Sequence, residues 1–231
     1  MIKVLHKRAG DVFDAGAING NIGKGLIECI NEDGSINISL SLNDVPPTRL
    51  PIIIGLGFVR PIQLRRLLRD LTTLGVEQID LFGTHLSDKS YTQTNLFKDG
   101  GAEEALIAGA VQARDTVLPR LNVHHNLNGW LKCNSENGIF RSACLFACDN
   151  VNSVATFATA DMSEQKRIVA AIGSERGWSH GERALLDDSG FSRVGLGSRA
   201  LRTETAAIAA AAMAVQILLK RETNFFEVRK S

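Results

Sequence analysis

The hydrophobic pattern changes near residue 50, and this change limits the possible folds more than any other feature of the sequence. Between Ser35 and Leu42 apolar and polar residues alternate strictly, which is typical of a strand with one buried face. Residues 52–56 read IIIGL, an apolar run typical of a strand covered on both faces. The intervening DVPPTRLP contains adjacent prolines that exclude helix. The sequence therefore predicts a small β module over residues 1–48 and an α/β domain over residues 49–231.

The N-terminal module is expected to be antiparallel. Short strands are predicted at residues 11–15, 26–30 and 35–42, with Asn-Gly and Asp-Gly turn sequences between them. The third strand has one apolar face, which is formed by Ile36, Ile38, Leu40 and Leu42. We expect this face to be buried and the serine-rich face to lie in solvent.

Beyond residue 50, predicted strands alternate with predicted helices, which is typical of a parallel sheet covered by helices. Pro61 suits the first turn of a helix, Gly75 suits its C-terminal cap, and leucines at helical spacing lie between them. Further strands are predicted at residues 78–82, 121–124, 143–147, 154–158, 167–172 and 193–196. Further helices are predicted at residues 102–113 and 179–189, and Thr203 is expected to cap a final alanine-rich helix.

The composition excludes several classes of protein. The four cysteines lack the spacing of a zinc site, so reduced thiols and no metal are expected. The N-terminal segment lacks the apolar core of a signal peptide, and the longest apolar run, residues 206–215, is too short to span a bilayer. We therefore expect a cytoplasmic protein without a membrane partner. Its net charge of +1 means that nucleic acid must be bound through local basic patches.

Two glycine-containing loops carry the clearest functional signal. The first, GSERGW, follows the strand predicted at residues 167–172, and the second, LGSRALRTETAA, leads into the final helix. They resemble the paired cofactor loops of the SPOUT RNA methyltransferases, and within them the RsmE-type family, whose patterns are close to IGPEGGF and LGPRILRTETA. The segments RRLLRDLTTLGVEQI, DKSY and QARDTVLP resemble the same family and occur in the same order.

This resemblance implies a particular fold, cofactor and substrate. The implied fold is α/β, a SPOUT-type parallel sheet with a C-terminal trefoil knot, preceded by a PUA-like antiparallel β module that binds RNA, and the implied assembly is a homodimer. The implied reaction is the methylation of N3 of a uridine in small-subunit (16S) ribosomal RNA. The residues that the resemblance places against S-adenosyl-L-methionine are Ile172, Gly173, Gly177, Leu196, Gly197, Leu201 and Arg202.

Arg202 and Glu204 are the predicted catalytic residues. Uracil N3 carries a proton near neutral pH, so it is a poor nucleophile until a base removes that proton. We expect Glu204 to accept the proton while Arg202 stabilises the charge that develops on the neighbouring uracil oxygens. The alternative for Glu204 is structural, because a carboxylate near a helix N-terminus gains about 0.3–1 kcal/mol from the helix dipole.

Four basic residues are predicted to contact RNA: Lys7, Arg8, Arg60 and Arg114. The resemblance implies that Lys7 and Arg8 belong to the RNA-binding module and that Arg114 belongs to a mid-domain family segment. Arg60 precedes a helix with three further arginines, and such a stripe suits phosphate contacts. The alternative for each of these residues is an ordinary solvated surface.

Some positions depart from the family pattern. Ser174 and Arg176 stand where proline and glycine are usual, and Ser198 and Ala200 replace a proline and a bulkier aliphatic residue. If Arg176 required a conformation that only glycine tolerates, the first loop would have to shift. The alternative function is therefore a catalytically inactive RNA-binding or ribosome-assembly protein. A further alternative, a dinucleotide-dependent oxidoreductase, rests on the GLG sequence at residues 55–57.

Overall fold

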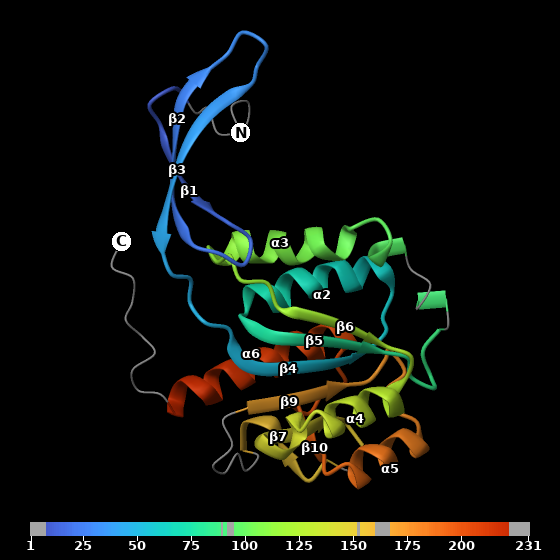
Figure 1. Ribbon diagram of the computed structural model, residues 1–231. Coiled ribbons are helices and arrows are strands. Elements are labelled where there is room, and N and C mark those ends of the chain that lie inside the picture. Colours follow the sequence, from blue (N-terminus) through green and yellow to red (C-terminus); the bar gives the residue numbers. More distant parts are fainter. Residues whose placement is uncertain (1–7, 89, 92–94, 152, 160–166, 222–231) are drawn as a thin grey trace.

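The computed structural model describes residues 8–88, 90–91, 95–151, 153–159 and 167–221, and these form two sheets (Figure 1). The N-terminal sheet is antiparallel and consists of β1 (Val12–Gly16), β2 (Ile22–Ile30) and β3 (Ile36–Asp44). The three predicted strands are therefore confirmed, although β2 begins earlier than expected. Figure 1 shows this sheet projecting from the rest of the molecule, and we call it the arm.

The apolar face of β3 is more exposed than its alternating pattern predicts. Ile38 and Leu40 are 45% and 54% exposed, whereas Ile27, opposite Ile38 on β2, is fully buried. The prediction that this face is buried is therefore wrong in the middle of the strand, because the described part of the arm leaves that region open to solvent.

The second sheet contains seven parallel strands in the order β6-β5-β4-β9-β7-β10-β8. The strands are β4 (Leu50–Gly57), β5 (Val76–Phe82), β6 (Arg120–His124), β7 (Ala143–Cys148), β8 (Ala155–Thr156), β9 (Arg167–Ile172) and β10 (Ser192–Gly195). Every strand predicted beyond residue 50 is present, but the one expected at residues 154–158 is short and continues as η4 (Phe157–Thr159). The α/β prediction is confirmed.

Helices cover both faces of this sheet (Figure 1). One face carries α2 (Pro61–Thr73), α3 (Gly101–Ala113) and α6 (Thr203–Arg221), and the other carries α4 (Leu127–Glu136) and α5 (His180–Asp188), with short turns at η2 (Asn95–Phe97) and η3 (Ile139–Ser142). The sequence analysis did not predict α4, because this short helix is largely polar. Its start is marked by Asn126, whose side chain accepts a hydrogen bond from the Gly129 N–H at 2.8 Å.

The continuous apolar run in β4 serves two separate cores. Ile52 and Ile54 point into the core beneath α2 and α6, and Ile53 points into the core that contains Trp130 of α4. All three isoleucines are fully buried. A central strand with a helical layer on each face requires this pattern, which explains why it differs from the alternation in β3.

The final helix α6 packs one side against the core, and a third of its apolar stretch, Thr203–Lys220, is buried. This stretch is longer than the apolar run of residues 206–215, so the expectation that it is too short to span a bilayer is corrected. The helix has the length and apolar composition of a membrane-crossing helix, yet it packs against β4, β9 and α2, and Ala207, Ala210 and Ala214 are fully buried.

Thr203 was expected to be the N-cap of this helix, but it is the first helical residue. The reason is that the Arg202 carbonyl already accepts a hydrogen bond from the Ala206 N–H at 2.8 Å, which places Arg202 at the cap position.

Candidate functional site

The two glycine-containing loops meet at the carboxyl ends of β9 and β10 and enclose a cavity of about 360 Å³, which we call the loop cavity. Six residues expected to bind the cofactor line it: Ile172, Gly173, Gly177, Leu196, Gly197 and Leu201. The seventh, Arg202, lines a neighbouring cavity instead. Ligands of open α/β sheets bind beyond the carboxyl ends of the strands, as this position allows.

The first loop is a tight turn that depends on glycine. Gly177 has a φ of +70°, and its N–H donates a hydrogen bond to the Ser174 carbonyl at 2.8 Å. A Cβ added at Gly173 would lie only 3.0 Å from the carbonyl carbon of Gly177. Glycine at these positions therefore allows the two ends of the turn to approach each other.

Arg176 fits this turn without strain. The left-handed position falls on Gly177, and among the described residues only Asn19 and Arg114 combine a side chain with a positive φ. Arg176 therefore does not adopt a conformation that only glycine tolerates. Its charge also helps to lower the pKa of Asp88, although the hydrogen bonds from Ser90 lower that pKa more.

Ser174, the second departure from the family pattern, lies at the wall of the loop cavity. The residue is 5% exposed, and within the described structure its Oγ has no hydrogen-bond partner. A buried hydroxyl without a partner is costly, so a ligand group that bonds to it would gain affinity.

The carboxyl end of β7 supplies a wall of the loop cavity that sequence reasoning did not identify. Asp149 is almost fully buried and accepts a hydrogen bond from Arg183 Nε at 2.6 Å. This bond is the main cause of the raised pKa of Arg183. Burial, followed by the charge of Asp149, raises the pKa of the Cys148 thiol to about 12, so this thiol is not a nucleophile at neutral pH.

A smaller cavity of about 290 Å³, which we call the charged cavity, adjoins the loop cavity. Its lining residues are Arg60, Gln63, Glu175, Arg202, Thr203 and Glu204. Glu175 and Thr203 line both cavities, so the two spaces meet at these residues. Arg202 Nη1 lies 4.0 Å from Glu204 Oε1, and the Arg202 side chain is 83% exposed. The predicted catalytic pair therefore lies beside the loop cavity.

Arg60 lies at the same junction, although it was predicted as a phosphate contact. Its Nε donates a hydrogen bond to Tyr91 Oη at 3.2 Å and lies 3.5 Å from Glu175 Oε1. The hydrogen bond to Tyr91, with a smaller effect of Glu175, raises the pKa of Arg60. The structure thus brings Arg60 and Arg202, which are far apart in the sequence, to one cavity.

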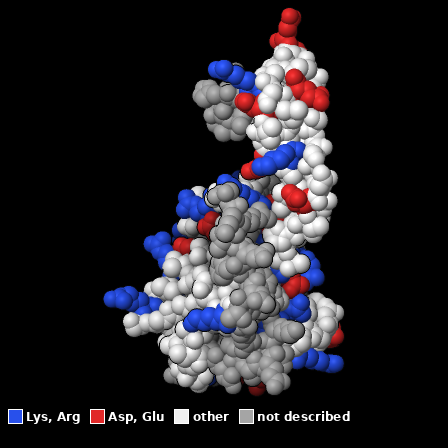
Figure 2. All heavy atoms as spheres, turned by 90° about the vertical axis from the view of Figure 1, so that its left-hand side faces the viewer, with Lys and Arg blue, Asp and Glu red and all other residues white. Residues whose placement is uncertain are grey.

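The other predicted RNA contacts are Lys7, Arg8 and Arg114. Lys7 is outside the described residues, Arg8 is exposed on the arm, and Arg114 is the exposed, left-handed C-cap of α3. Neither Arg8 nor Arg114 lines the loop cavity or the charged cavity. Figure 2 shows basic side chains scattered over this face with acidic ones between them, and acidic side chains at the tip of the arm. The described residues on the face shown form no single basic band.

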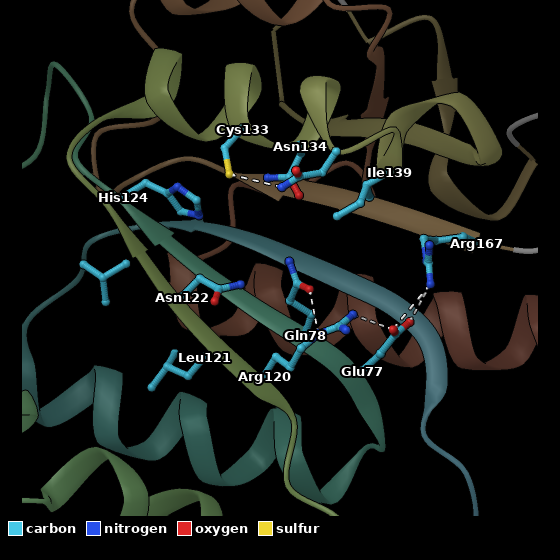
Figure 3. A pocket seen from close by; sticks show the side chains of 12 residues that line it. Glu77, Gln78, Arg120, Leu121, Asn122, His124, Cys133, Asn134, Ile139 and Arg167 are labelled. Atoms are coloured by element: carbon cyan, nitrogen blue, oxygen red, sulfur yellow. Dashed lines mark hydrogen bonds and ion pairs between the residues drawn. The ribbon is translucent and has the colours of Figure 1, made fainter.

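A larger groove of about 710 Å³ lies along β5, β6 and α4 (Figure 3). At one end, Glu77 pairs with Arg120 at 2.6 Å and with Arg167 at 3.1 Å. Beneath it, the fully buried Asp80 accepts hydrogen bonds at 2.7–2.9 Å from Trp130 Nε1, Asn122 Nδ2 and Gln78 Nε2. His124 Nε2 lies 4.0 Å from Asp80. Most of these charges are already paired within the protein.

The described residues were also compared with the requirements of a metal ion. In the part of the chain that the structure describes, no three His, Cys, Asp or Glu side chains are grouped so that they could hold a metal ion. His124, next to His125 in the sequence, lies beside the buried carboxylate of Asp80.

Comparisons with known proteins identify relatives of this chain. The family model for the RNA methyltransferase domain matches residues 46–215. "Ribosomal RNA small subunit methyltransferase E" from Treponema pallidum is 36% identical over 213 residues, which is 91% of this chain and 79% of that protein. "Ribosomal RNA small subunit methyltransferase E 1" from Borreliella burgdorferi is 28% identical over 221 residues, or 95% and 89% of the two chains.

Solved structures show the same fold. The putative methyltransferase Lpg2936 from Legionella pneumophila, determined in complex with SAM, has a TM-score of 0.74 at 20% identity and covers 95% of this chain and 87% of its own. A ribosomal RNA small subunit methyltransferase E from Neisseria gonorrhoeae, bound to S-adenosyl methionine, has a TM-score of 0.69 at 19% identity, with 94% and 87% covered. The family model and the Treponema relative show that this chain belongs to the RsmE-type family of RNA methyltransferases.

Proposed function

We propose that this protein is an S-adenosylmethionine-dependent methyltransferase that methylates N3 of a uridine in small-subunit ribosomal RNA. The observation that carries the proposal is the junction of two cavities, one enclosed by the glycine-containing loops and one lined by two arginines and two glutamates. The first cavity suits a methyl donor, and the second suits a uracil ring that must lose the proton on N3. The names of the relatives support the ribosomal substrate.

The loop cavity fits S-adenosylmethionine. Its volume, about 360 Å³, lies within the range of about 300–1,000 Å³ that is common for small-molecule sites. Leu196 and Leu201 offer apolar contacts, the backbone around Gly173 and Gly177 offers peptide groups to an adenine edge, and the Ser174 hydroxyl lacks a partner. Arg202 approaches from the adjoining charged cavity. When bound, the cofactor supplies an electrophilic methyl group on a sulfonium sulfur.

Glu204 and Arg202 are the proposed catalytic residues. Glu204 accepts the proton from uracil N3, and Arg202 stabilises the negative charge that then spreads to the uracil oxygens. Their place in the charged cavity supports these roles, because a base held there lies next to the loop cavity. The walls around Thr203 and Glu175 align N3 toward the methyl group.

Finer features of the fold are part of the proposal. The C-terminal trefoil knot is supported by the path of the chain, because α6 follows β10 near one edge of the sheet and yet packs against the central strands β4 and β9. The arm is proposed as a PUA-like module for RNA over residues 1–48, with the methyltransferase domain over residues 49–231. Lys7, Arg8 and Arg114 are further proposed RNA contacts; of these, Arg8 and Arg114 do not line the two cavities, and Lys7 is outside the described residues.

The proposed assembly is a homodimer in the cytoplasm. One side of α6 supports this assembly, because Ile208, Val215 and Leu219 remain partly exposed along the helix. A second copy of this chain would cover that apolar side. Sedimentation of the purified protein tests the assembly, and a monomer at micromolar concentration would contradict it.

Cofactor titration and RNA analysis test the proposed function together. We expect the purified protein to bind S-adenosylmethionine in calorimetry and to transfer labelled methyl groups to small ribosomal subunits from cells that lack it. Mass spectrometry of that ribosomal RNA should show one N3-methyluridine only after the reaction. If millimolar S-adenosylmethionine does not bind, the inactive RNA-binding or assembly protein is the correct reading, and binding of a nicotinamide dinucleotide would indicate the oxidoreductase.

A further inference from the structure

Two arginine–glutamate pairs from distant parts of the sequence line the charged cavity. Arg60 follows β4 and lies 3.5 Å from Glu175 of the first loop, while Arg202 lies 4.0 Å from Glu204 at the start of α6. The cavity of about 290 Å³ therefore presents two guanidinium groups and two carboxylates within one small space.

Both guanidinium groups retain donors for a ligand. Within the described structure Arg60 is engaged through Nε alone, by Tyr91 and Glu175, and its side chain is 64% exposed. The Arg202 side chain is 83% exposed and its ion pair is long. Since a guanidinium has five N–H donors, each arginine can bond to a further oxygen while keeping its glutamate.

The pattern of donors and acceptors selects a particular kind of base. The edge of uracil around N3 presents an acceptor, a donor and an acceptor, namely O4, N3–H and O2. Its complement is a donor, an acceptor and a donor, and the two arginines and the carboxylates that line the charged cavity include these groups. Cytosine presents an amino donor and an unprotonated N3 on the same edge, so it would leave donors facing donors.

We propose that Arg60 is a second carbonyl-binding residue of the reaction and that Arg60 and Arg202 together select uracil by holding O2 and O4. This inference rests on the proposed function. Once N3 has lost its proton, the negative charge is shared with both oxygens, so a cation at each oxygen stabilises the anion. Glu175 is a positioning residue, because its ion pair directs Arg60 into the charged cavity.

The competing role for Arg60 is a simple phosphate contact. A phosphate contact would contribute to RNA affinity and to its salt dependence, but it would leave the ease of N3 deprotonation unchanged. A carbonyl contact would affect the chemical step, and its importance would diminish at high pH, where uridine N3 loses its proton without help.

The test compares Arg60→Gln with Arg65→Gln. Arg65 is a matched control, since it lies on α2, is 54% exposed, and pairs with Glu104 at 2.5 Å without lining the charged cavity. We expect Arg60→Gln to lower kcat on small ribosomal subunits by about 10²-fold at neutral pH, as for loss of one oxyanion donor. This deficit should shrink as the pH rises, and Arg65→Gln should alter only KM.

Three outcomes separate the possibilities. An unchanged Kd for S-adenosylmethionine shows that Arg60→Gln is folded, so a lost kcat with a pH-dependent deficit supports the proposal. An unchanged kcat and pH profile, or a change in KM and salt dependence like that of Arg65→Gln, would overturn it while leaving the proposed function intact. An inactive wild-type protein would overturn both.

A competition experiment with synthetic RNA adds a second measurement. A fragment with cytidine at the methylated position should compete more weakly than its uridine counterpart for the wild-type protein. Arg60→Gln should narrow this difference. An equal difference in both proteins would contradict the assignment of uracil selection to Arg60.

Discussion

The groove in Figure 3 and the charged cavity contain the same kinds of charged residue but differ in how completely these are paired. In the groove, Glu77 lies 2.6 and 3.1 Å from two arginines. In the charged cavity, the two arginine–glutamate distances are 3.5 and 4.0 Å. The groove is the larger of the two spaces, and its carboxylates are paired more closely, although Arg167 Nε and His124 Nε2 at its wall have no hydrogen-bond partner in the described structure.

This difference indicates which region binds and which stabilises. A fully hydrogen-bonded polar network fixes the fold, and breaking it leaves buried groups without partners. Loosely paired charges at the end of strands can be rearranged by a ligand at little cost. Substitutions in the charged cavity are therefore expected to change catalysis, and substitutions beneath the groove to change stability.

Glu204→Gln should give the largest effect. The amide cannot accept the N3 proton, so we expect kcat to fall by about 10²- to 10⁴-fold, the usual contribution of a general base. Stability should change little, because Glu204 has only a distant ion pair. Methyl transfer to small ribosomal subunits measures the effect.

Glu104→Gln is the control for this prediction, since Glu104 also pairs with an arginine but lies outside the charged cavity. It should retain wild-type kcat. If Glu204→Gln does the same, the carboxylate serves only the helix N-terminus, with an effect on stability of about 0.3–1 kcal/mol.

Asp80→Ala tests the other side of the comparison. It removes the acceptor for the buried donors of Trp130 and Gln78 and for the partly buried donor of Asn122, so these groups lose their partner. Each unsatisfied group costs about 1–3 kcal/mol, and we expect a total loss of about 3 kcal/mol in the free energy of unfolding, measured by urea denaturation. The Kd for S-adenosylmethionine should remain unchanged below the transition. A loss of stability equal to that of the exposed Glu104→Gln variant would contradict the structural role of Asp80.

The loop cavity and the charged cavity also differ in how far they could be predicted from the sequence. The loop cavity was largely predictable, because Gly173, Gly177 and Gly197 are local features of the sequence with a distinctive pattern around them. The strands were predictable for a similar reason, since periodicity along the chain reports on local structure.

Residues brought together by the fold could not be identified from the sequence. Asp149 lines the loop cavity only because β7 lies between β9 and β10, and this order follows from long-range packing. Arg60 and Glu175 meet for the same reason, since β4 and β9 are neighbours in the sheet. The network around Asp80 depends on α4, whose polar sequence gave no helical signal.

Gly177→Ala should have a moderate effect that is specific to binding. The φ of +70° costs a residue with a Cβ about 1–2 kcal/mol, so we expect the loop to shift and S-adenosylmethionine affinity to fall about tenfold. Gly190→Ala is a matched control, because Gly190 has a φ of +84° and does not line the loop cavity. Both variants should lose similar stability, but only Gly177→Ala should change the Kd in calorimetry. Equal Kd values would show that the turn does not shape the binding site.

Cys148→Ala should give the smallest effect, a change in how the free energy of unfolding depends on pH. It tests whether the wall of the loop cavity at β7 is buried. Burial raises the pKa of the Cys148 thiol from 9.0 to about 12, so the folded protein keeps this proton where the unfolded chain has lost it. Because the folded state then binds more protons, the stability contributed by this group is complete below pH 9 and is lost as the pH rises toward 12. The slope is at most about 1.4 kcal/mol per pH unit for one group. Urea denaturation at pH 8, 9 and 10 should show a steeper decline for the wild type than for Cys148→Ala. If the free energy of unfolding fell equally with pH in both proteins, the Cys148 thiol would be open to solvent. The loop cavity would then lack a buried wall at β7.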